Sequence, residues 1–585
     1  MRKTKIVATI GPASDDVEII KKMISAGMNA ARINFSHGSY ETHAETIKKI
    51  KQARKELNAP IPLILDTRGP EIRIKTFDKE SVYLKQGEKF TLTTDDVVGD
   101  ETRVAVTYAN LPDDLKIGGR VLIDDGLIEL KVESVEDGEI RCEIVNSGFL
   151  SSHKGVNVPD VYVNLPSLTE KDIEDIQFGV EHGFDYIAVS FVRSANDVLN
   201  VREVIEQAGG EDVMIISKIE NRDGVDNIDD ILELSDGIMV ARGDLGVEIP
   251  PEEVPVVQKT LIRKANEKGK PVITATQMLE SMVNNPRPTR AEANDVANAI
   301  FDGSDAIMLS GETAKGHYPE ESVYMMAKIA EGSEKSIDYS KFSMMTRHVT
   351  YKTTITNAIG FAACTTAADL SAACIVAVTD SGFTPRMVSH FRPACPILAV
   401  TKNAQIWRKL NLAWGCVPVL FSKIDTEEHI FNEPLNLAVK YGLAKDGDPI
   451  VIAAGIPTGV PGTTNTIRVV IVGDVITRGE GYGDKTVAGY ANVIKVIEEA
   501  EKYFRPGDIL VTTKTTNEMM PYIKKASAIV VGSWEKIDHA HSVTVAKALD
   551  KPLIISGQKV IDLIRDGFPI TVDTEKGIVY NGIRQ

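Results

Sequence analysis

The segment "RINFSHG", residues 32–38, places four kinds of polar group directly after an apolar stretch. Arg32, Asn34, Ser36 and His37 offer a guanidinium, a carboxamide, a hydroxyl and an imidazole. A strand that served only for packing would carry residues such as Val or Ile here. We therefore interpret the segment as a strand end that contributes to a binding or catalytic site.

Charged residues also lie at the ends of two further apolar stretches, in the segments "MIISKIEN" and "GIMVARGDLG". Glu220 and Asp244 are hard oxygen ligands that suit a Mg²⁺ ion with positions left open for substrate oxygens. Lys218 and Arg32 would place positive charge where a phosphoryl group or an enolate oxygen binds. Each motif also has a simpler interpretation. Lys218 and Glu220 could form a surface ion pair, and "ARGDLG" could be a glycine-rich turn.

Oxygen donors and another guanidinium occur in "LDTRGPEIR". Arg73 could hold a phosphate through its fork of N–H groups. The mixed neutral and singly negative oxygens of Asn34, Ser36, Asp66 and Thr67 would suit a monovalent cation. Cations and metal ligands around a phosphate, without a covalent nucleophile, indicate phosphoryl transfer. The sequence has no GxxxxGK[ST] loop and no HRD…DFG pair, which excludes Walker-type and protein-kinase sites.

The elements that must position these groups alternate between strands and helices. Strands are expected at "KIVATI", "AARINF", "PLILD", "YIAVS", "MIISK", "GIMVA", "VITAT" and "AIMLS". The polar residues follow the same end of strand after strand, as at the carboxyl face of a (β/α)8 TIM barrel. A doubly wound parallel sheet would show the same alternation and remains an alternative.

The chain is long enough for about four domains. We expect the α/β barrel at residues 1–69 and 167–345. An alternating polar–apolar pattern predicts an inserted antiparallel β domain at residues 70–166, with a tight hairpin turn at Asp125-Gly126. Two α/β domains should follow, at residues 346–473 and 474–585.

The overall composition excludes several classes of protein. A net charge of -17 argues against a nucleic-acid partner. The sequence has no apolar run of about 18 residues, and its first apolar run is too short for a signal peptide, so we expect no membrane partner. The five cysteines are dispersed and lack CxxC spacing. This pattern favours neither zinc nor disulfides, and it favours a cytoplasmic location.

Several segments together resemble the pyruvate kinase family, in order from Lys3 to about Gly473. They are "ATIGPAS", "ARINFSHG", "LDTRGPEIR", "KIEN", "VARGDLGVEIP", "TATQMLESM", "RPTRAEANDVANAI" and "IMLSGETAKGHYP". The resemblance implies phosphoryl transfer from phosphoenolpyruvate to ADP, giving pyruvate and ATP in the last step of glycolysis. It also implies a barrel, a mobile cap, an α/β regulatory domain and a homotetramer.

The resemblance also implies roles for residues around the substrate. Arg32 would contact the phosphate of phosphoenolpyruvate and of ADP, and Lys218 would neutralise the phosphoryl group during transfer. The backbone at Gly243 and Asp244 and the hydroxyl of Thr276 would hold the substrate carboxylate. Water on the Thr276 side would then protonate the enolate.

The cofactors implied by the resemblance are Mg²⁺ (or Mn²⁺) and K⁺. Glu220 and Asp244 would hold the divalent ion, and Glu71 matches the form that the family associates with K⁺ dependence. The expected K⁺ ligands are Asn34, Ser36, Asp66 and Thr67. The expected nucleotide contacts are Asn34, His37, Arg73 and Lys154.

The segment "TDSGFTPRMVSHFRP" resembles the family's hydroxyl-rich effector loop. The effector-binding candidates are Thr379, Ser381, Gly382 and Thr384. Asp380 is negative where relatives that bind a bisphosphorylated sugar often carry Lys. We therefore expect a nucleotide or sugar monophosphate as the effector, with a plain strand–turn–helix as the alternative.

The last segment resembles the phosphohistidine domain of phosphoenolpyruvate-utilising enzymes. His541 falls at the place of the phosphorylated histidine, but His539-Ala540 precedes it instead of Thr-Ser. We therefore favour a structural or regulatory role for this domain. Two alternatives for the whole chain remain: a synthase or dikinase that works through His541, and a catalytically inactive barrel that senses phosphorylated metabolites.

Overall fold

The structure is a computed structural model that describes residues 1–159, 161, 163, 165–339, 354–422, 427–455, 464–473, 475–497, 503–533 and 539–583. The chain forms two compact units. One comprises residues 1–364, 377–423 and 453–466, and the other comprises residues 365–376, 424–452 and 467–585. The domain boundaries expected at residues 345–346 and at residue 474 lie outside the described residues.

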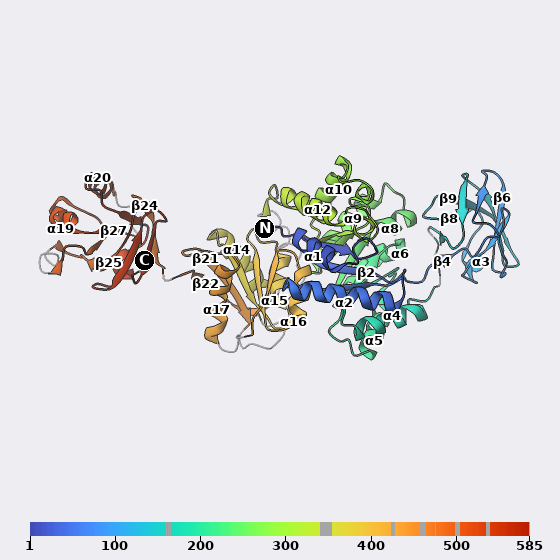
Figure 1. The fold of residues 1–585 in the computed structure, drawn as a ribbon, viewed down its shortest axis with the longest axis horizontal. Coiled ribbons are helices and arrows are strands. Elements are labelled where there is room, and N and C mark those ends of the chain that lie inside the picture. Colours follow the sequence, from blue (N-terminus) through green and yellow to red (C-terminus); the bar gives the residue numbers. More distant parts are fainter. Residues whose placement is uncertain are drawn as a thin grey trace. The chain divides into compact units, whose positions relative to one another are not determined.

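Eight strands form a closed barrel in the first unit (Figure 1). In spatial order they are β1 (Lys5–Thr9), β17 (Ala306–Leu309), β16 (Val272–Ala275), β15 (Gly237–Ala241), β14 (Met214–Ile219), β13 (Tyr186–Val189), β3 (Leu63–Asp66) and β2 (Ala30–Asn34). All neighbours pair in parallel. The TIM-barrel prediction is confirmed, and the doubly wound sheet is wrong.

The barrel strands are buried on both faces. Ile6 and Ala8 of β1 pack outward in the main core, whereas Val7 belongs to a separate cluster of strand residues that includes Ile64 and Ile216. Because side chains alternate along a strand, these two clusters are the barrel's outer layer and its filled interior. Because side chains fill the interior of the barrel, a binding or catalytic site has to lie at the ends of the strands.

Helices surround the barrel, and several of them begin where a short polar side chain caps the first turn. Thr169 forms a capping box with Asp172, and Asp16 accepts hydrogen bonds from Glu18 N and Ile19 N. The helices of this part are α1 (Val17–Ala26), α2 (Tyr40–Glu56), α4 (Glu170–Glu181), α5 (Ala195–Gln207), α6 (Arg222–Asp226), α7 (Ile228–Leu234), α8 (Arg242–Glu248), α9 (Val254–Glu267), the 3₁₀ helix η1 (Glu280–Val283), α10 (Arg290–Phe301), α11 (Gly311–Ala314) and α12 (Pro319–Glu334).

A β domain is inserted after β3. Its main sheet has the order β4 (Ile72–Arg73), β12 (Gly155–Asn157), β8 (Arg120–Ile123), β9 (Ile128–Glu136), β10 (Glu139–Ile144), β6 (Lys89–Thr93) and β7 (Arg103–Ala105); β5 (Ser81–Leu84) pairs with β11 (Gly148–Ser151), and α3 spans Leu111–Asp114. Every pair is antiparallel except β6 with β7. The predicted turn joins β8 to β9, with positive φ angles at Asp124, Asp125 and Gly126.

A five-stranded sheet follows the barrel. Its order is β20 (Cys416–Leu420), β19 (Ile397–Thr401), β18 (Cys374–Val378), β21 (Pro449–Gly455) and β22 (Thr464–Ile471). Its helices are α14 (Ile355–Asp369), α15 (Phe383–His390), α16 (Ala404–Lys409), the 3₁₀ helix η2 (Leu410–Leu412) and α17 (Glu427–Lys440). The apolar segments "CIVAVT", "ILAV" and "RVVIVG" predict three of these strands, and they form β18, β19 and β22.

The last hundred residues form an eight-stranded mixed sheet. Its order is β23 (Val475–Arg478), β30 (Ile578–Asn581), β29 (Pro569–Asp573), β25 (Thr486–Val493), β26 (Ile509–Thr512), β27 (Ala528–Gly532), β28 (Leu553–Ser556) and β24 (Glu480–Tyr482). Its helices are η3 (Asn517–Met519), α19 (Met520–Lys525), α20 (Ala540–Ala548) and α21 (Val560–Leu563). In the described part of the chain, no helix combines the length and the apolar character that crossing a membrane requires.

Candidate active site

Asp66, the last residue of β3, binds two cations, Arg32 from the adjacent strand β2 and Lys218 from β14, which lies beyond β13. Its Oδ2 accepts a hydrogen bond from Arg32 Nε at 2.6 Å, and its Oδ1 accepts one from Lys218 Nζ at 3.0 Å. Asp66 has no exposed surface, and both cations are buried. Burial acts to raise the pKa of Asp66, but the charges of Arg32 and Lys218 lower it below the ordinary value. This carboxylate therefore stays ionised and fixes both cations at one end of the barrel.

Lys218 also contacts Glu220, the residue that directly follows its own strand β14. Its Nζ lies 2.9 Å from Glu220 Oε1 and donates to Ser190 Oγ at 2.7 Å. Burial by itself would lower the pKa of Lys218, but Asp66, Glu220 and Asp244 raise it above the ordinary lysine value. Lys218 and Glu220 are thus a buried pair in a cluster of charges, and the surface ion-pair interpretation is wrong.

Glu220 combines burial with a second nearby carboxylate. Burial raises the pKa of Glu220, and the charge of Asp244 adds to this effect against the opposing charge of Lys218. Its Oε2 accepts a hydrogen bond from the backbone N–H of Phe191, a residue in the left-handed region with a φ of 54°. A divalent cation between the carboxylates of Glu220 and Asp244 would relieve their unfavourable proximity.

The chemistry of this donor set fits a divalent ion that is only partly held by protein. No group of three or more His, Cys, Asp and Glu side chains able to hold a metal occurs in the described ranges. Mg²⁺ commonly takes one or two carboxylates and completes its shell with water and substrate oxygens. Glu220 and Asp244 match that pattern.

The segment "ARGDLG" is helical from its first polar residue, so the turn interpretation is wrong. Helix α8 begins at Arg242 directly after β15. The Gly243 N–H donates to Thr276 Oγ1 at 2.8 Å, and this hydroxyl donates to the carbonyl of Ala275 at 2.7 Å. Thr276 has a φ of 66° and Gln277 one of 53°, conformations that cost energy in non-glycine residues and concentrate at functional sites.

The oxygen donors expected to bind a monovalent cation come from β2, β3 and the residues that follow them. Asn34 pairs with Asp66 in the strand register, and Asn34 Oδ1 accepts a hydrogen bond from Ser36 N at 3.1 Å. Thr67 Oγ1 accepts one from Ser190 N at 3.1 Å. These oxygens retain lone pairs after their hydrogen bonds, so the donor set fits a hard cation.

Glu71 and Arg73 form a pair that the sequence alone did not indicate. Glu71 Oε2 accepts a hydrogen bond from Arg73 Nε at 2.7 Å, and Arg73 Nη1 donates to the carbonyl of His153 at 2.7 Å. Arg73 belongs to β4, the first strand of the inserted domain. His37 lies exposed after β2.

Lys154 also belongs to the inserted domain, where its Nζ lies 2.9 Å from Asp124 Oδ1. The pKa of the neighbouring Asp125 is raised by burial, and the negative charge of Asp244, a barrel residue, raises it further. A direct contact joins the same domains, since Asn157 Nδ2 donates to Glu248 Oε1 at 2.7 Å.

Two further residues in this network, Ser190 and Thr9, were missed in the sequence, and Arg242 was given no role there. Ser190 follows β13 and joins Lys218 to the carbonyl of Thr67 through its hydroxyl. Thr9 ends β1 and accepts a hydrogen bond from Arg32 Nη1 at 2.9 Å, and Arg242 Nη2 donates to the carbonyl of Thr276 at 2.7 Å. The signal was present, because "KIVAT" and "YIAVS" end in a hydroxyl residue as the other strands end in polar ones.

The candidate effector loop precedes α15. Thr379 Oγ1 accepts from Gly382 N at 2.9 Å, Ser381 Oγ accepts from Phe383 N at 3.4 Å, and the hydroxyls of Thr384 and Thr464 lie 2.7 Å apart. Gly382 has a φ of 78°, which favours glycine. Asp380 is paired with Lys402 at 3.5 Å.

His541 lies in the last domain, in the first turn of α20. Its Nδ1 lies 2.8 Å from Thr515 Oγ1, and its Nε2 lies 3.0 Å from Asn517 Oδ1. Neutral partners therefore occupy both ring nitrogens.

Comparison with known proteins identifies relatives along the whole chain. The pyruvate kinase barrel domain matches residues 1–323, the pyruvate kinase alpha/beta domain matches residues 357–470, and the mobile domain of PEP-utilising enzymes matches residues 504–577. The pyruvate kinase of Geobacillus stearothermophilus is 48% identical over 99% of both chains, and that of Sporosarcina psychrophila is 47% identical over 100% of this chain and 99% of its own. A crystal structure of a pyruvate kinase from Cryptosporidium parvum, 40% identical, superposes with a TM-score of 0.77 over 80% of this chain and 96% of that one. The chain therefore belongs to the pyruvate kinase family and is a phosphotransferase.

Proposed function

We propose that the chain transfers the phosphoryl group of phosphoenolpyruvate to ADP, giving pyruvate and ATP in the last step of glycolysis, with Mg²⁺ (or Mn²⁺) and K⁺ as cofactors. The observation that carries the proposal is the double pairing of Asp66, which holds Arg32 and Lys218 side by side. Phosphoryl transfer depends on positioned positive charge around the moving group, and the double pairing supplies it.

Lys218 acts in this proposal as a fixed ammonium and never as a base. Its surrounding carboxylates raise its pKa, so it remains charged throughout turnover. It would neutralise the phosphoryl group during transfer, while Arg32 would contact the phosphate of phosphoenolpyruvate and of ADP. Preorganised charge in a buried site lowers the barrier because no solvent has to reorganise.

The substrate carboxylate would lie against α8 and the end of β16. There the backbone of Gly243 and Asp244 and the hydroxyl of Thr276 can orient it, supported by the hydrogen bond between Gly243 N and Thr276 Oγ1. The strained backbone of Thr276 fixes the position of that hydroxyl. Water on this side would deliver the proton to the enolate.

Glu220 and Asp244 would hold Mg²⁺, which would supply Lewis acidity to the bound substrate. Asn34, Ser36, Asp66 and Thr67 would hold K⁺. Arg73, His37 and Lys154, with Asn34, would contact the nucleotide. Arg73 and Lys154 belong to the inserted domain, and this placement suits residues that act when a cap closes over bound nucleotide.

The proposal also includes an effector site and an oligomeric state. The hydroxyls of Thr379, Ser381 and Thr384 and the backbone of Gly382 would bind the phosphate of a nucleotide or sugar monophosphate. The Asp380–Lys402 pair disfavours a second phosphate beside it. We further propose a homotetramer in the cytoplasm, in keeping with five free cysteines. We assign His541 no catalytic role.

The test is pyruvate formation from phosphoenolpyruvate and ADP with Mg²⁺, with and without K⁺. Turnover stimulated by K⁺ is the expected result. Turnover indifferent to K⁺ would remove the K⁺ site and leave the reaction. The absence of turnover, with nucleotide and sugar monophosphates present, would favour the metabolite-sensing barrel.

A further inference from the structure

The loop between β13 and α5 contacts the candidate active site and the inserted domain at the same time. Its residues Ser190 to Arg193 follow β13 at the carboxyl end of the barrel. The hydroxyl of Ser190 accepts a hydrogen bond from Lys218, and the N–H of the next residue, Phe191, donates to Glu220. Both members of the buried pair of Lys218 and Glu220 are therefore held by adjacent residues of one loop.

Phe191 holds Glu220 through a backbone conformation that is unusual for an aromatic residue. Its φ is 54°, in the left-handed region, and its N–H lies 2.7 Å from Glu220 Oε2. A left-handed backbone at a bulky residue costs energy and persists only where the surrounding structure enforces it. The direction of this N–H is therefore set by the packing around Phe191.

Phe191 packs on Gly69, in the segment that leads from β3 into the inserted domain. A Cβ atom on Gly69 would lie 2.8 Å from Phe191 Cδ2 and 2.7 Å from Ser190 Cβ, so only glycine allows this approach. Gly69 has a φ of 76°, and its N–H donates to Asp172 Oδ1 at 2.9 Å. The chain thus enters the inserted domain in contact with the residue that holds Glu220.

Arg193 contacts the segment that leads back from the inserted domain to the barrel. Its Nη1 donates to the carbonyl of Val163 at 2.7 Å, and its Nη2 donates to that of Leu165 at 2.6 Å. The backbone of Arg193 is anchored to the barrel, since its N–H donates to Asp197 Oδ2 and its carbonyl accepts from Asn227 Nδ2, both at 2.9 Å. Both crossings between the barrel and the inserted domain are therefore bound to this one loop.

These contacts connect the position of the inserted domain to that of Glu220. Closely packed and hydrogen-bonded groups transmit small displacements because the structure has no free space to absorb them. A shift of the inserted domain would move Gly69 or the carbonyls that Arg193 binds, and the loop would carry this shift to Glu220. The reverse also holds, because a coupling free energy between two sites is reciprocal.

We propose that Phe191 and Arg193 are positioning residues through which the inserted domain sets the place of Glu220, and with it the affinity for the divalent ion. Phe191 acts on Glu220 through its backbone N–H, and Arg193 acts through the loop that it shares with Phe191. The inference rests on the proposed function, because it takes Glu220 as a ligand of that ion.

Mn²⁺ reports on this site without turnover, because its binding to the full chain can be followed by electron paramagnetic resonance in the absence of substrate. Glu220→Gln should remove the tightest Mn²⁺ site and thereby identify it. Arg193→Gln should weaken binding at that site about fivefold, the effect of about one net hydrogen bond. Wild-type affinity in Arg193→Gln would overturn this inference alone. A wild-type chain without a Mn²⁺ site that depends on Glu220 would overturn the proposed function as well.

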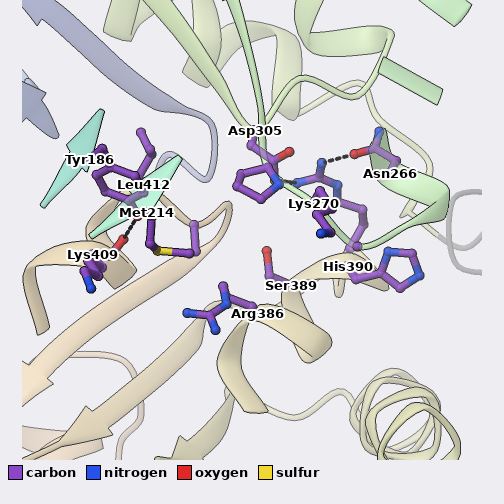
Figure 2. Close-up of a pocket in the computed structure, with 14 residues that line it drawn as sticks. Tyr186, Met214, Asn266, Lys270, Asp305, Arg386, Ser389, His390, Lys409 and Leu412 are labelled. Carbon is purple, nitrogen blue, oxygen red and sulfur yellow. Dashed lines mark hydrogen bonds and ion pairs between the residues drawn. The ribbon is translucent and has the colours of Figure 1, made fainter. Parts of the chain in front are cut away.

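A merely structural role for Arg193 predicts lower stability without a change in Mn²⁺ binding, and Asn266→Ala is the control for such a loss. Asn266 lies at the amino-terminal strand ends, in the pocket that Figure 2 shows. There its Nδ2 donates to the carbonyl of Gly303 and its Oδ1 accepts from Arg392, both at 3.0 Å. Asn266→Ala should melt at a lower temperature and bind Mn²⁺ as the wild type does. Equal losses of Mn²⁺ affinity in Asn266→Ala and Arg193→Gln would contradict the inference.

Two substitutions of Phe191 separate the effect of its backbone from that of its ring. Both Asn and Gly lack the ring, but Asn is enriched in the left-handed region, whereas Gly adopts many other conformations as readily. Phe191→Gly should therefore bind Mn²⁺ about threefold more weakly than Phe191→Asn. Equal affinities would contradict the role of the N–H. This pair also decides the matter if Arg193→Gln does not fold.

Hydrogen exchange provides the reciprocal measurement, made on a peptide that contains Gly69. Mn²⁺ should slow the exchange of this peptide in the wild type, because the ring of Phe191 packs on Gly69. The slowing should be lost in Phe191→Asn, which lacks the ring. Equal slowing in both chains would show that the ring does not connect the ion site to the inserted domain, and this result would overturn the inference.

Discussion

Lys218 Nζ lies 3.0 Å from Asp66 Oδ1, so that an ammonium from β14 is anchored to a carboxylate at the end of β3. Both side chains are buried. Asp66 binds Arg32 through its other oxygen, so a single residue sets the spacing between the two cations that we assign to the phosphoryl group. The predictions about catalysis follow from this arrangement.

Lys218→Met should lower turnover by about 10³-fold, close to the loss on removing one oxyanion-stabilising donor. Phosphoenolpyruvate should still bind, because Arg32 and the Gly243 backbone remain. The measurements are kcat for pyruvate formation and calorimetric binding of phosphoenolpyruvate. Lys48→Met, at an exposed lysine, is the control. Retained turnover in Lys218→Met would contradict the proposed role.

Ser190→Ala should lower kcat by about tenfold, the value of one hydrogen bond of about 1.4 kcal/mol. Ser190 Oγ donates to Thr67 O and accepts from Lys218 Nζ, both at 2.7 Å, so it positions the ammonium. The KM for phosphoenolpyruvate should change little. Ser217→Ala removes another buried barrel hydroxyl, bonded to Ser235, and should lower stability without changing kcat. Equal kcat losses in both variants would assign Ser190 a purely structural role.

Much of the barrel could be predicted from alternation alone. The strands from "KIVATI" to "AIMLS" are apolar along their length because both faces are buried, and the caps at Asp16 and Thr169 are local signals. Three strands of the five-stranded sheet, β18, β19 and β22, were expected from their apolar patterns, whereas β20 and β21 were not. In the last domain, "DILVT", "AIVV" and "PLIIS" predicted β26, β27 and β28, whereas β23, β24, β25, β29 and β30 were missed, since the antiparallel strands there carry weaker apolar patterns.

The sequence predicted which residues belong to the candidate site, but it did not predict the contacts between them. Residue types at strand ends indicated Arg32, Lys218, Glu220 and Asp244, because parallel strands align their carboxyl ends. Contacts such as the one between Glu71 and Arg73 depend on the path of the chain as it enters the inserted domain. The positive φ of Thr276 likewise has no local sequence signal. Such features arise from tertiary packing.

Glu71→Lys should remove the requirement for K⁺. The lysine ammonium would supply the positive charge that the ion provides near Asn34 and Asp66, so activities in K⁺ and in tetramethylammonium should differ less than about twofold. Glu71→Gln removes the negative charge without adding a cation and should keep the requirement of the wild type. The readout is kcat against K⁺ concentration at constant ionic strength. A Glu71→Lys enzyme that still needs K⁺ would contradict the assignment of these ligands.

His390 should make the protein less stable as the solution becomes more acidic. Burial lowers the pKa of His390 to about 4, with the charge of Arg392 adding to the effect, whereas an unfolded histidine titrates near 6.5. Between these values the unfolded chain binds a proton that the folded chain does not, so stability is intact above about pH 6.5 and falls as the pH drops toward 4. The loss reaches about 3 kcal/mol at pH 4.

The measurement for His390 is the melting temperature between pH 4 and 7.5. His390→Asn cannot take up the proton, so its melting temperature should decline less steeply than that of the wild type over this interval. The exposed His37 supplies the control variant, His37→Asn, whose curve should follow the wild type. If the melting temperatures of His390→Asn and the wild type fell equally at acidic pH, His390 would be protonated equally in the folded and the unfolded chain. That result would contradict its burial beside Arg392 and Gly269.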